Sequence, residues 1–407
     1  MRAAYPTKKL GDLCHIARGG SPRPIQSYLT DAPDGISWIK ISDATASQKY
    51  IEYTKEKIRP EGLKKSRLVK PGDFILSNSM SFGRPYIMKT TGCIHDGWLV
   101  LSDKCGLFDQ DYLFHFLGSD AAYRQFDKLA AGSTVRNLNS DLVKTVDVPL
   151  PPLEEQRWIV AVLDEAFAAI ATATANAEKN LANARELFDA TLRETFANPD
   201  PSAQFLTLKQ ASLDFGRGKS KHRPRNDPKL YGGEYPFIQT GDVRNCEHLI
   251  TEYSQTYCTA GLAQSKLWPK GTICITIAAN IAETGILTFD ACFPDSVIGM
   301  VVDPNRTSSS YAEYLLQSLK AVLQAKGKGS AQDNLNLAAF ENERFPFPPK
   351  AIQLSIVERL GGLSEQVQAM EALYGDKLIA LTSLKQSLLH RAFTGELTAT
   401  VLDTIAA

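Results

Sequence analysis

The sequence predicts an α+β protein built from two similar halves, each a globular part followed by one long helix. One observation is an internal repeat: Trp38 matches Phe237 and Asp43 matches Asp242, in both cases 199 positions apart. Another is a heptad pattern of apolar residues late in each half. The composition is that of a globular chain, since 43% of the 407 residues are hydrophobic and 22% are charged. At about 150 residues per domain, this length favours two or three domains.

The spacing between matching residues changes along the chain. It is 199 at Cys93 and Cys292, 202 where residues 111–113 match 313–315, and 197 without a gap from Asn137 onward. Insertions therefore fall in the first part of each half and not in the last. This pattern favours two variable domains on spacers of fixed length, and a plain duplication with chance insertions is the alternative.

The globular parts are predicted to be residues 1–150 and 204–349. Both are rich in glycine, proline and aromatic residues, with short β-like runs such as 36–41 and 271–277. Short helical stretches such as 110–116 interrupt these runs. Each part therefore reads as a small α+β domain.

The remaining segments, 151–203 and 350–407, are predicted to hold one long helix each, the second followed by a C-terminal tail. Their apolar residues recur at steps of four and three. They are Ile159, Leu163, Ala166, Ile170, Ala173 and Ala177, and then Ile356, Leu360, Leu363, Val367, Met370 and Tyr374. A helix of about 40 residues is roughly 60 Å long and cannot bury such a seam alone. We therefore expect an antiparallel coiled coil with pseudo-two-fold symmetry, in which Gly361 and Gly362 mark a kink or close packing.

The candidate helix-pairing and partner-docking residues come from this seam. They are Ile159, Leu163 and Ile170 in the first helix and Ile356, Leu360 and Val367 in the second.

Catalytic and metal-binding motifs are not apparent. Gly218-Lys219-Ser220 resembles the end of a phosphate-binding loop, but Leu213 stands where that loop needs its first glycine. The six histidines are scattered, and the seven cysteines form no CxxC pair, so we expect no zinc site and free buried thiols in a reducing cytoplasm. The chain start lacks the apolar run of a signal peptide, and no stretch of 18 apolar residues predicts a membrane span.

The net charge is zero, with 45 basic and 45 acidic residues, but the basic residues are clustered. One cluster lies in residues 55–70 and the other in 209–229, one in each globular part. Such clusters can bind phosphates of nucleic acid, although a charge run is more often a solvated surface. The candidate DNA contacts are Arg18, Arg23, Lys40, Lys64, Lys65, Arg67, Asn78, Arg84 and Arg136 in the first half, and Arg217, Lys219, Lys221, Arg223, Arg225, Gln239, Arg244, Lys266 and Lys328 in the second.

Two motifs resemble those of a known family. Leu150-Pro151-Pro152-Leu153-Glu154-Glu155-Gln156, followed by Ile159-Val160, is similar to the boundary motif of type I restriction–modification specificity subunits. The segment from Leu388 to Leu397 is similar to that family's closing motif. The second boundary departs from the pattern, since Lys350-Ala351-Ile352 stands where Leu153-Glu154-Glu155 stands in the first. The two partner-docking surfaces are therefore not expected to be exactly equivalent.

The resemblance implies a non-catalytic, cytoplasmic subunit that binds double-stranded DNA. Each globular part would be a target recognition domain for one half of a two-part, asymmetric site. The helices would dock two modification (methyltransferase) subunits, which restriction (motor and nuclease) subunits would join. No cofactor would bind this chain, whereas S-adenosylmethionine, ATP and Mg²⁺ would bind the partner subunits. The alternatives are a stand-alone duplicated DNA-binding regulator and a diverged methyltransferase or nuclease.

Overall fold

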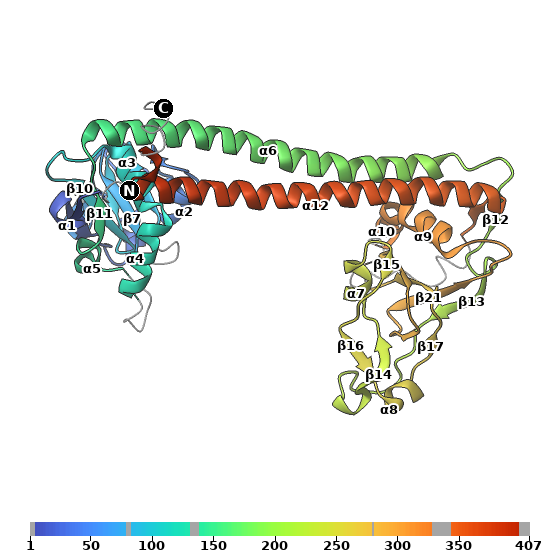
Figure 1. Cartoon of the computed structure of the whole chain (residues 1–407). Coiled ribbons are helices and arrows are strands. Elements are labelled where there is room, and N and C mark those ends of the chain that lie inside the picture. The colour runs from blue at the N-terminus through green and yellow to red at the C-terminus, as the bar shows by residue number, and fades with distance from the viewer. Residues whose placement is uncertain (1–4, 79–82, 131–137, 279–280, 328–342, 399–407) are drawn as a thin grey trace, which may run out of the picture. The chain divides into compact units, whose positions relative to one another are not determined.

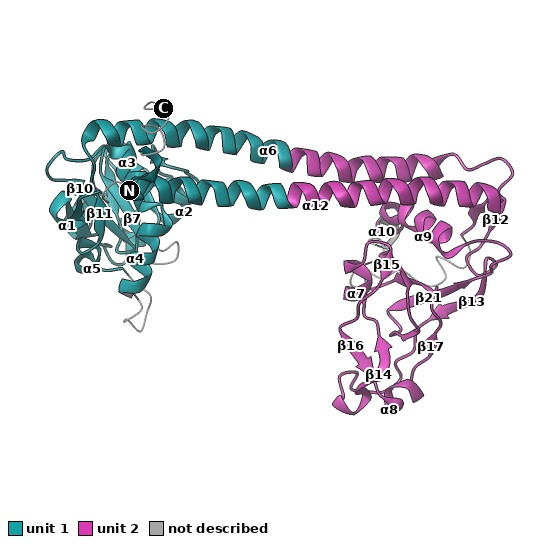
Figure 2. Cartoon of the chain, in the orientation of Figure 1, with its two compact units in different colours: residues 1–177, 376–407 teal, residues 178–375 magenta. Residues whose placement is uncertain are grey.

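The structure is a computed structural model. It describes all residues except 1–4, 79–82, 131–137, 279–280, 328–342 and 399–407. The chain divides into two compact units, residues 1–177 with 376–407 and residues 178–375, which Figure 2 colours separately. Each unit combines one globular part with a stretch of both long helices, whereas the sequence prediction divided the chain into four consecutive segments.

The first globular part, which contains β7, β10 and α3 in Figure 1, is built on a five-stranded sheet. Its strand order is β2-β10-β7-β8-β4. Its strands are β2 (Cys14–Arg18), β4 (Tyr50–Ile51), β7 (Phe74–Ser77), β8 (Pro85–Met88) and β10 (Trp98–Asp103). A four-stranded sheet has the order β5-β3-β9-β6 and consists of β3 (Ile36–Ile39), β5 (Glu56–Ile58), β6 (Arg67–Val69) and β9 (Gly92–Ile94). The pair β1 (Thr7–Lys9) and β11 (Asp147–Pro149) joins the two ends of this part. All four residues of β7 and all four of β8 are buried, so both faces of the sheet are covered there.

Short helices complete the first part. They are α1 (Leu10–Leu13), α2 (Ile41–Thr45), α3 (Gln110–Leu117), α4 (Asp120–Ala130) and α5 (Ser140–Lys144), with 3₁₀ turns η1 (Ile25–Ser27) and η2 (Pro60–Lys65). Helix α3 begins after Asp109, whose carboxylate accepts hydrogen bonds from the backbone N–H groups of Asp111 (3.0 Å) and Tyr112 (3.2 Å). Tyr112 then packs edge-on against Phe393, with ring centres 5.4 Å apart. The helix therefore connects the sheet to the long helix at the end of the chain.

The second globular part repeats this arrangement strand for strand. Its five-stranded sheet, β13-β21-β18-β19-β15, consists of β13 (Ser212–Arg217), β15 (Leu249–Ile250), β18 (Ile273–Thr276), β19 (Thr284–Leu287) and β21 (Val297–Val302). Its four-stranded sheet, β16-β14-β20-β17, consists of β14 (Tyr231–Phe237), β16 (Gln255–Tyr257), β17 (Leu267–Trp268) and β20 (Ala291–Cys292). The end pair is β12 (Gln204–Leu206) and β22 (Phe345–Phe347), and the helices are α7 (Thr240–Asn245), α8 (Thr259–Ala263), α9 (Ser309–Ser318) and α10 (Lys320–Gly327), with the 3₁₀ turn η3 (Pro228–Leu230). The predicted internal repeat and the α+β class are confirmed.

The match at a spacing of 202 is wrong. The hydroxyl of Tyr112 donates to the carbonyl oxygen of Pro149 (3.0 Å), and the hydroxyl of Tyr311 donates in the same way to Pro346 (2.9 Å). The spacing is therefore still 199 in α3 and α9. A helix repeats its faces every 3.6 residues, so a three-residue slip leaves the apolar pattern almost in register.

The two long helices are α6 (Leu153–Ala197) and α12 (Lys350–Thr394), and each has 45 residues. Both begin directly after a Pro-Pro pair, because a proline is tolerated in the first turn of a helix but not in its interior. The first residues of the two helices are 197 positions apart, and so are their last residues, as the spacing of the apolar residues predicted.

The helices pair in opposite directions. In the second unit, the side-chain amide of Asn180 donates to the hydroxyl of Tyr374 (3.1 Å), and Arg185 forms an ion pair with Glu371. From Asn180 to Arg185 the residue numbers on α6 rise, whereas those of their contacts on α12 fall from Tyr374 to Glu371. The expected antiparallel arrangement is therefore confirmed. In the first unit, the ammonium of Lys385 lies 4.9 Å from the ring centre of Phe167.

The apolar seam departs from the prediction in places. Ile159, Leu163, Leu360 and Val367 are buried, and Ile170 and Ile356 are half-buried. Met370, in contrast, is 47% exposed. Beyond the predicted residues of α6, the seam passes through Ala184 and the half-buried Phe188, whereas the apolar neighbour Leu187 is 55% exposed. The predicted close packing at Gly361 and Gly362 is wrong, because a Cβ atom at either position would meet nothing within 4 Å.

One helix is long and apolar enough to cross a membrane by length and composition alone. It is α6, in which the best window has a mean hydropathy of 1.5. A single such helix is weak support for a membrane span, and Ile159 and Leu163 of α6 are fully buried in the core of the first unit.

Candidate nucleic-acid interface

Basic side chains of the first unit gather around Asp96, in the loop before β10. The Arg18 guanidinium donates to the Asp96 backbone carbonyl (2.9 Å), and Arg23 forms an ion pair with its carboxylate (3.3 Å). The Ser21 hydroxyl also donates to this carboxylate (2.7 Å). This hydrogen bond is the main reason that the pKa of Asp96 is lowered, and Arg23 adds to the effect. Asp96 thus stays ionised and holds the two arginines at the surface.

The backbone brings Arg18 close to the loop of Asp96 because Arg18 ends β2 and a glycine follows it. The backbone N–H of Gly19 donates to the carbonyl of Trp98 (2.9 Å). A Cβ atom on Gly19 would lie 2.1 Å from the carbonyl oxygen of His95, so no other residue fits this close approach.

More of the predicted residues join this cluster. The guanidinium of Arg67 donates to the backbone carbonyl of Arg18 (3.3 Å), and the ammonium of Lys65 donates to the hydroxyl of Tyr28 (2.8 Å). Lys64 is exposed beside Lys65 at the end of η2. We call Arg18, Arg23, Lys64, Lys65 and Arg67 the first basic cluster.

The second unit contains the same construction. Arg217 ends β13, and Gly218 follows it, donating to the carbonyl of Val297 (2.9 Å). A Cβ atom on Gly218 would lie 2.2 Å from the carbonyl oxygen of Phe293. Asp295 stands where Asp96 stands in the first unit, and one nitrogen of Arg225 contacts both of its carboxylate oxygens (2.8 and 2.9 Å).

Three more of the predicted basic residues follow Arg217 and Gly218 directly in the chain. Lys219 and Lys221 are exposed after β13, and the guanidinium of Arg223 donates to the backbone carbonyl of Ser220 (2.6 Å). We call Arg217, Lys219, Lys221, Arg223 and Arg225 the second basic cluster. Lys266 has other partners, since its ammonium lies 2.5 Å from the Asp214 carboxylate and 3.4 Å from the Trp268 ring centre.

Two predicted residues occupy equivalent positions at the end of a strand. Lys40 follows β3 and lies 2.5 Å from the carboxylate of Glu56. Gln239 follows β14, and its amide donates to the side-chain carbonyl of Gln255 (2.7 Å). Both partners escaped the sequence prediction, although Glu56 and Gln255 keep the spacing of 199.

Other predicted residues are placed apart. Asn78 is 1% exposed and donates to the Asp96 carbonyl (2.8 Å), so it positions the aspartate loop and offers no surface to DNA. Arg84 lines a cleft of about 820 Å³ together with Lys49 and Lys385, and its guanidinium lies 5.3 Å from the ring centre of Tyr86. Arg244 is exposed near the end of α7. Arg136 and Lys328 lie outside the described residues.

Among the residues that the structure describes, no group of three or more His, Cys, Asp or Glu side chains could hold a metal ion. Burial raises the pKa values of the Cys14 and Cys246 thiols to about 12, so neither is a thiolate near neutral pH.

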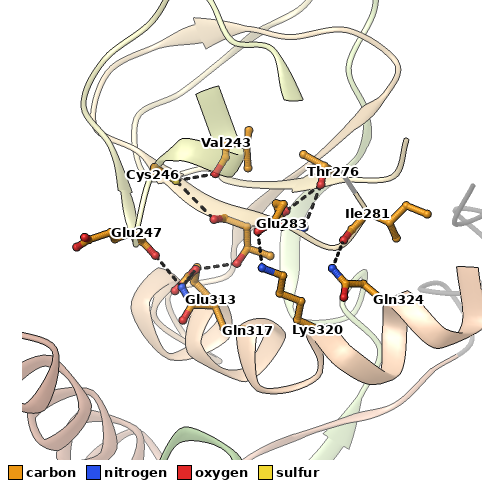
Figure 3. Close-up of polar contacts among 11 residues, drawn as sticks. Val243, Cys246, Glu247, Thr276, Ile281, Glu283, Glu313, Gln317, Lys320 and Gln324 are labelled. Carbon is orange, nitrogen blue, oxygen red and sulfur yellow. Dashed lines mark hydrogen bonds and ion pairs between the residues drawn. The ribbon is translucent and has the colours of Figure 1, made fainter. Parts of the chain in front are cut away.

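The most buried carboxylate of the second unit stabilises the fold. Glu313 of α9 is fully buried, and it accepts hydrogen bonds from Thr284 of β19 (2.7 Å) and Gln317 (2.6 Å). Gln317 in turn donates to the backbone of Glu247 (2.9 Å), as Figure 3 shows. His248 approaches Glu313 within 2.5 Å. These bonds connect α9 to the sheet and to the loop after α7, and they use both oxygens of the carboxylate.

Comparison with known proteins gives a consistent picture. The family model described as "Type I restriction modification DNA specificity domain" matches residues 4–181 and 213–374. The chain is 21% identical over 309 residues to the type I restriction enzyme StySPI specificity subunit of Salmonella potsdam, covering 71% of this chain and 66% of that protein. It is also 21% identical over 363 residues to the EcoKI specificity subunit of Escherichia coli K12, covering 83% and 77%.

Solved structures share the fold. A chain from a study of "complex assembly" and "conformational transition of the type I R-M system" has a TM-score of 0.80 at 19% identity, covering 97% of this chain and 99% of that one. The HsdS subunit from Thermoanaerobacter tengcongensis has a TM-score of 0.62 at 19% identity, covering 96% and 97%.

Proposed function

Since this chain belongs to the family of type I restriction–modification DNA specificity subunits, we propose that its globular parts are two target recognition domains, each of which reads one half of a two-part asymmetric DNA site. The observation that carries this proposal is that Arg18, Gly19 and Asp96 recur 199 positions later as Arg217, Gly218 and Asp295, and that an arginine binds the carboxylate of each aspartate. A basic cluster surrounds each copy. Two copies of one reading unit in a single chain suit a target with two separate parts.

The physical argument rests on charge and exposure. Lys64, Lys65, Lys219 and Lys221 are exposed at the surface, where ammonium groups can replace the counterions of DNA phosphates. Phosphate contacts set the position of a protein on the duplex, whereas polar side chains against base edges read the sequence. Each globular part supplies both kinds of side chain.

In the assembled enzyme, this chain directs partner subunits and carries out no chemistry of its own. Two modification subunits with adenine methyltransferase activity dock on the paired helices α6 and α12, and restriction subunits complete the enzyme. S-adenosylmethionine, ATP and Mg²⁺ bind to these partners. The complex works where the cell's DNA lies, in the cytoplasm.

The proposal is tested by reconstitution. The purified chain is incubated with S-adenosylmethionine and a DNA library containing random sequence, with and without a modification subunit, and the methylated adenines are mapped. We expect methylation only with the modification subunit, in a motif of two specified parts separated by an unspecified gap. Methylation by the isolated chain would indicate a diverged enzyme. Specific binding by the chain alone, with no methylation in the mixture, would indicate a regulator.

A further inference from the structure

Each unit presents one side-chain pair at the same place, and the two pairs differ in chemistry. Lys40 pairs with Glu56 in the first unit, and Gln239 pairs with Gln255 in the second. The partner residue faces an aromatic residue across the strand pair: Glu56 is opposite Trp38 in β3 and β5, and Gln255 is opposite Phe237 in β14 and β16. The backbone therefore places both pairs alike.

The backbone at these positions is held independently of the side chains. The N–H of Lys40 donates to the carboxylate of Asp43 (2.9 Å), and the N–H of Gln239 donates to that of Asp242 (2.7 Å). The aspartates thus complete the start of α2 and α7. Each long side chain remains available for contacts outside the domain, from a fixed starting point.

In the second unit, this pair lines a surface cleft of about 460 Å³. Hydrogen-bonding side chains of Asn226, Thr240 and Arg225 line the same cleft, and none of its described lining residues is acidic. Arg225 belongs to the second basic cluster, so a duplex held by this cluster would bring its bases near the glutamine pair. The cleft therefore presents hydrogen-bonding side chains of the kind that contact base edges.

The two pairs match different base pairs. A lysine donates to O6 and N7 of guanine, and a glutamate accepts from the N4 amino group of cytosine, so Lys40 and Glu56 together suit a G·C pair. A glutamine bonds to N6 and N7 of adenine, so Gln239 and Gln255 suit an A·T pair. The mutual contacts in the free protein do not oppose this, because Lys40 and Glu56 are about 40% and 36% exposed and water screens such ion pairs strongly.

We propose that Lys40–Glu56 and Gln239–Gln255 are equivalent base-reading pairs, the first reading a G·C pair and the second an A·T pair at the corresponding position of each half-site. This inference rests on the proposed function and specifies which side chains read the sequence.

The test exchanges the two pairs. One variant carries Lys40→Gln with Glu56→Gln, a second carries Gln239→Lys with Gln255→Glu, and Gln204→Lys is a control at an exposed glutamine of the second unit. Each is assembled with the modification subunit, and its methylated motif is mapped in the random library. We expect the first variant to change one position of one half from G·C to A·T, and the second to make the opposite change in the other half. The gap, the other positions and the control's motif should stay the same.

A second measurement covers variants that methylate poorly. Binding of the assembled complex to duplexes that differ at this base pair should show about 5- to 150-fold discrimination in the unchanged protein. The single variants Glu56→Ala and Gln255→Ala should reduce it. An unchanged motif, or a folded exchange variant that methylates no site, would overturn the inference. If the unchanged chain yields no two-part motif at all, the proposed function fails instead.

Discussion

Replacing Gln156 with leucine should destabilise the first unit strongly, because this glutamine is fully buried and its side chain connects three backbone groups. Its amide donates to the carbonyls of Pro151 (2.8 Å) and Leu107 (3.2 Å), and its carbonyl accepts from the N–H of Asp109 (2.7 Å). The side chain thus joins the start of α6 to the residue that caps α3.

The magnitude follows from the groups left unpaired. Leucine has a similar size, so the change creates little cavity, but it strands the N–H of Asp109 and the carbonyl of Pro151 in a dry site. Each stranded buried group costs about 1–3 kcal/mol, so we expect the free energy of unfolding to fall by about 3 kcal/mol. For a unit of about 200 residues this corresponds to a loss of roughly 6–12 °C in melting temperature.

The assay needs a matched control in the same unit. Gln125 also bonds to backbone groups, donating to the carbonyl of Asp147 (3.0 Å) and accepting from its N–H (2.8 Å), but it is an exposed contact. Gln125→Leu should change the free energy of unfolding by less than about 0.5 kcal/mol, because water replaces the lost bonds. Urea unfolding gives the free energies, and hydrogen exchange in residues 105–115 locates the effect.

The reasoning would be refuted if Gln156→Leu and Gln125→Leu were equally stable. It would also be refuted if exchange rose in the second unit and not in residues 105–115. Gln353 provides an internal repetition, since its amide donates to the carbonyls of Pro348 and Arg306 (both 2.8 Å). Gln353→Leu should therefore have the same effect on the second unit.

Three further predictions concern charge, pH and helix propensity. Replacing Lys64, Lys65 and Arg67 together with alanine should reduce the slope of log affinity for DNA against log salt concentration by about 0.9 per lost phosphate contact, and an unchanged slope would assign these residues to a solvated surface. Burial lowers the pKa of His115 in the folded protein, so the neutral imidazole stabilises the fold at pH values above its pKa in the unfolded chain, about 6.5. This stability is lost as the pH falls below that value. His115→Gln should therefore flatten the plot of urea midpoint against pH in this range. Gly361→Ala should raise the free energy of unfolding by about 1 kcal/mol, since the added methyl group meets open space, and a lower melting temperature would contradict this.

The long helices were predictable because their signals are local. The steps of four and three between apolar residues, and the Pro-Pro pairs before them, correctly indicated α6 (Leu153–Ala197) and α12 (Lys350–Thr394). Where the signal is weaker, the prediction failed: Met370 fits the heptad pattern and yet is exposed, and further along α6 the seam includes Phe188 and not its apolar neighbour Leu187. The packing of Phe188 against Tyr314 decides the seam there, and a heptad pattern contains no information about that neighbour.

The candidate interface was predictable only in part. The basic clusters are visible in the sequence, but Arg18 and Asp96 are 78 positions apart, and only the pairing of β2 with β10 brings them together. The spacing of 199 between Asp96 and Asp295 was a signal that could have identified this loop. Asn78 illustrates the opposite case, since a polar residue in a polar stretch proved to be buried.

The sequence by itself determined the repeat, the α+β class, the long helices and the family, because these depend on residue order and on periods of a few residues. The tertiary structure decided which side chains share a surface: the arginines around Asp96, the pair Lys40–Glu56 and its counterpart Gln239–Gln255. Such contacts depend on strand order and register, in which a shift of one residue turns every side chain to the other face of a sheet. That geometry arises from packing between distant segments and is not encoded in any single stretch of the chain.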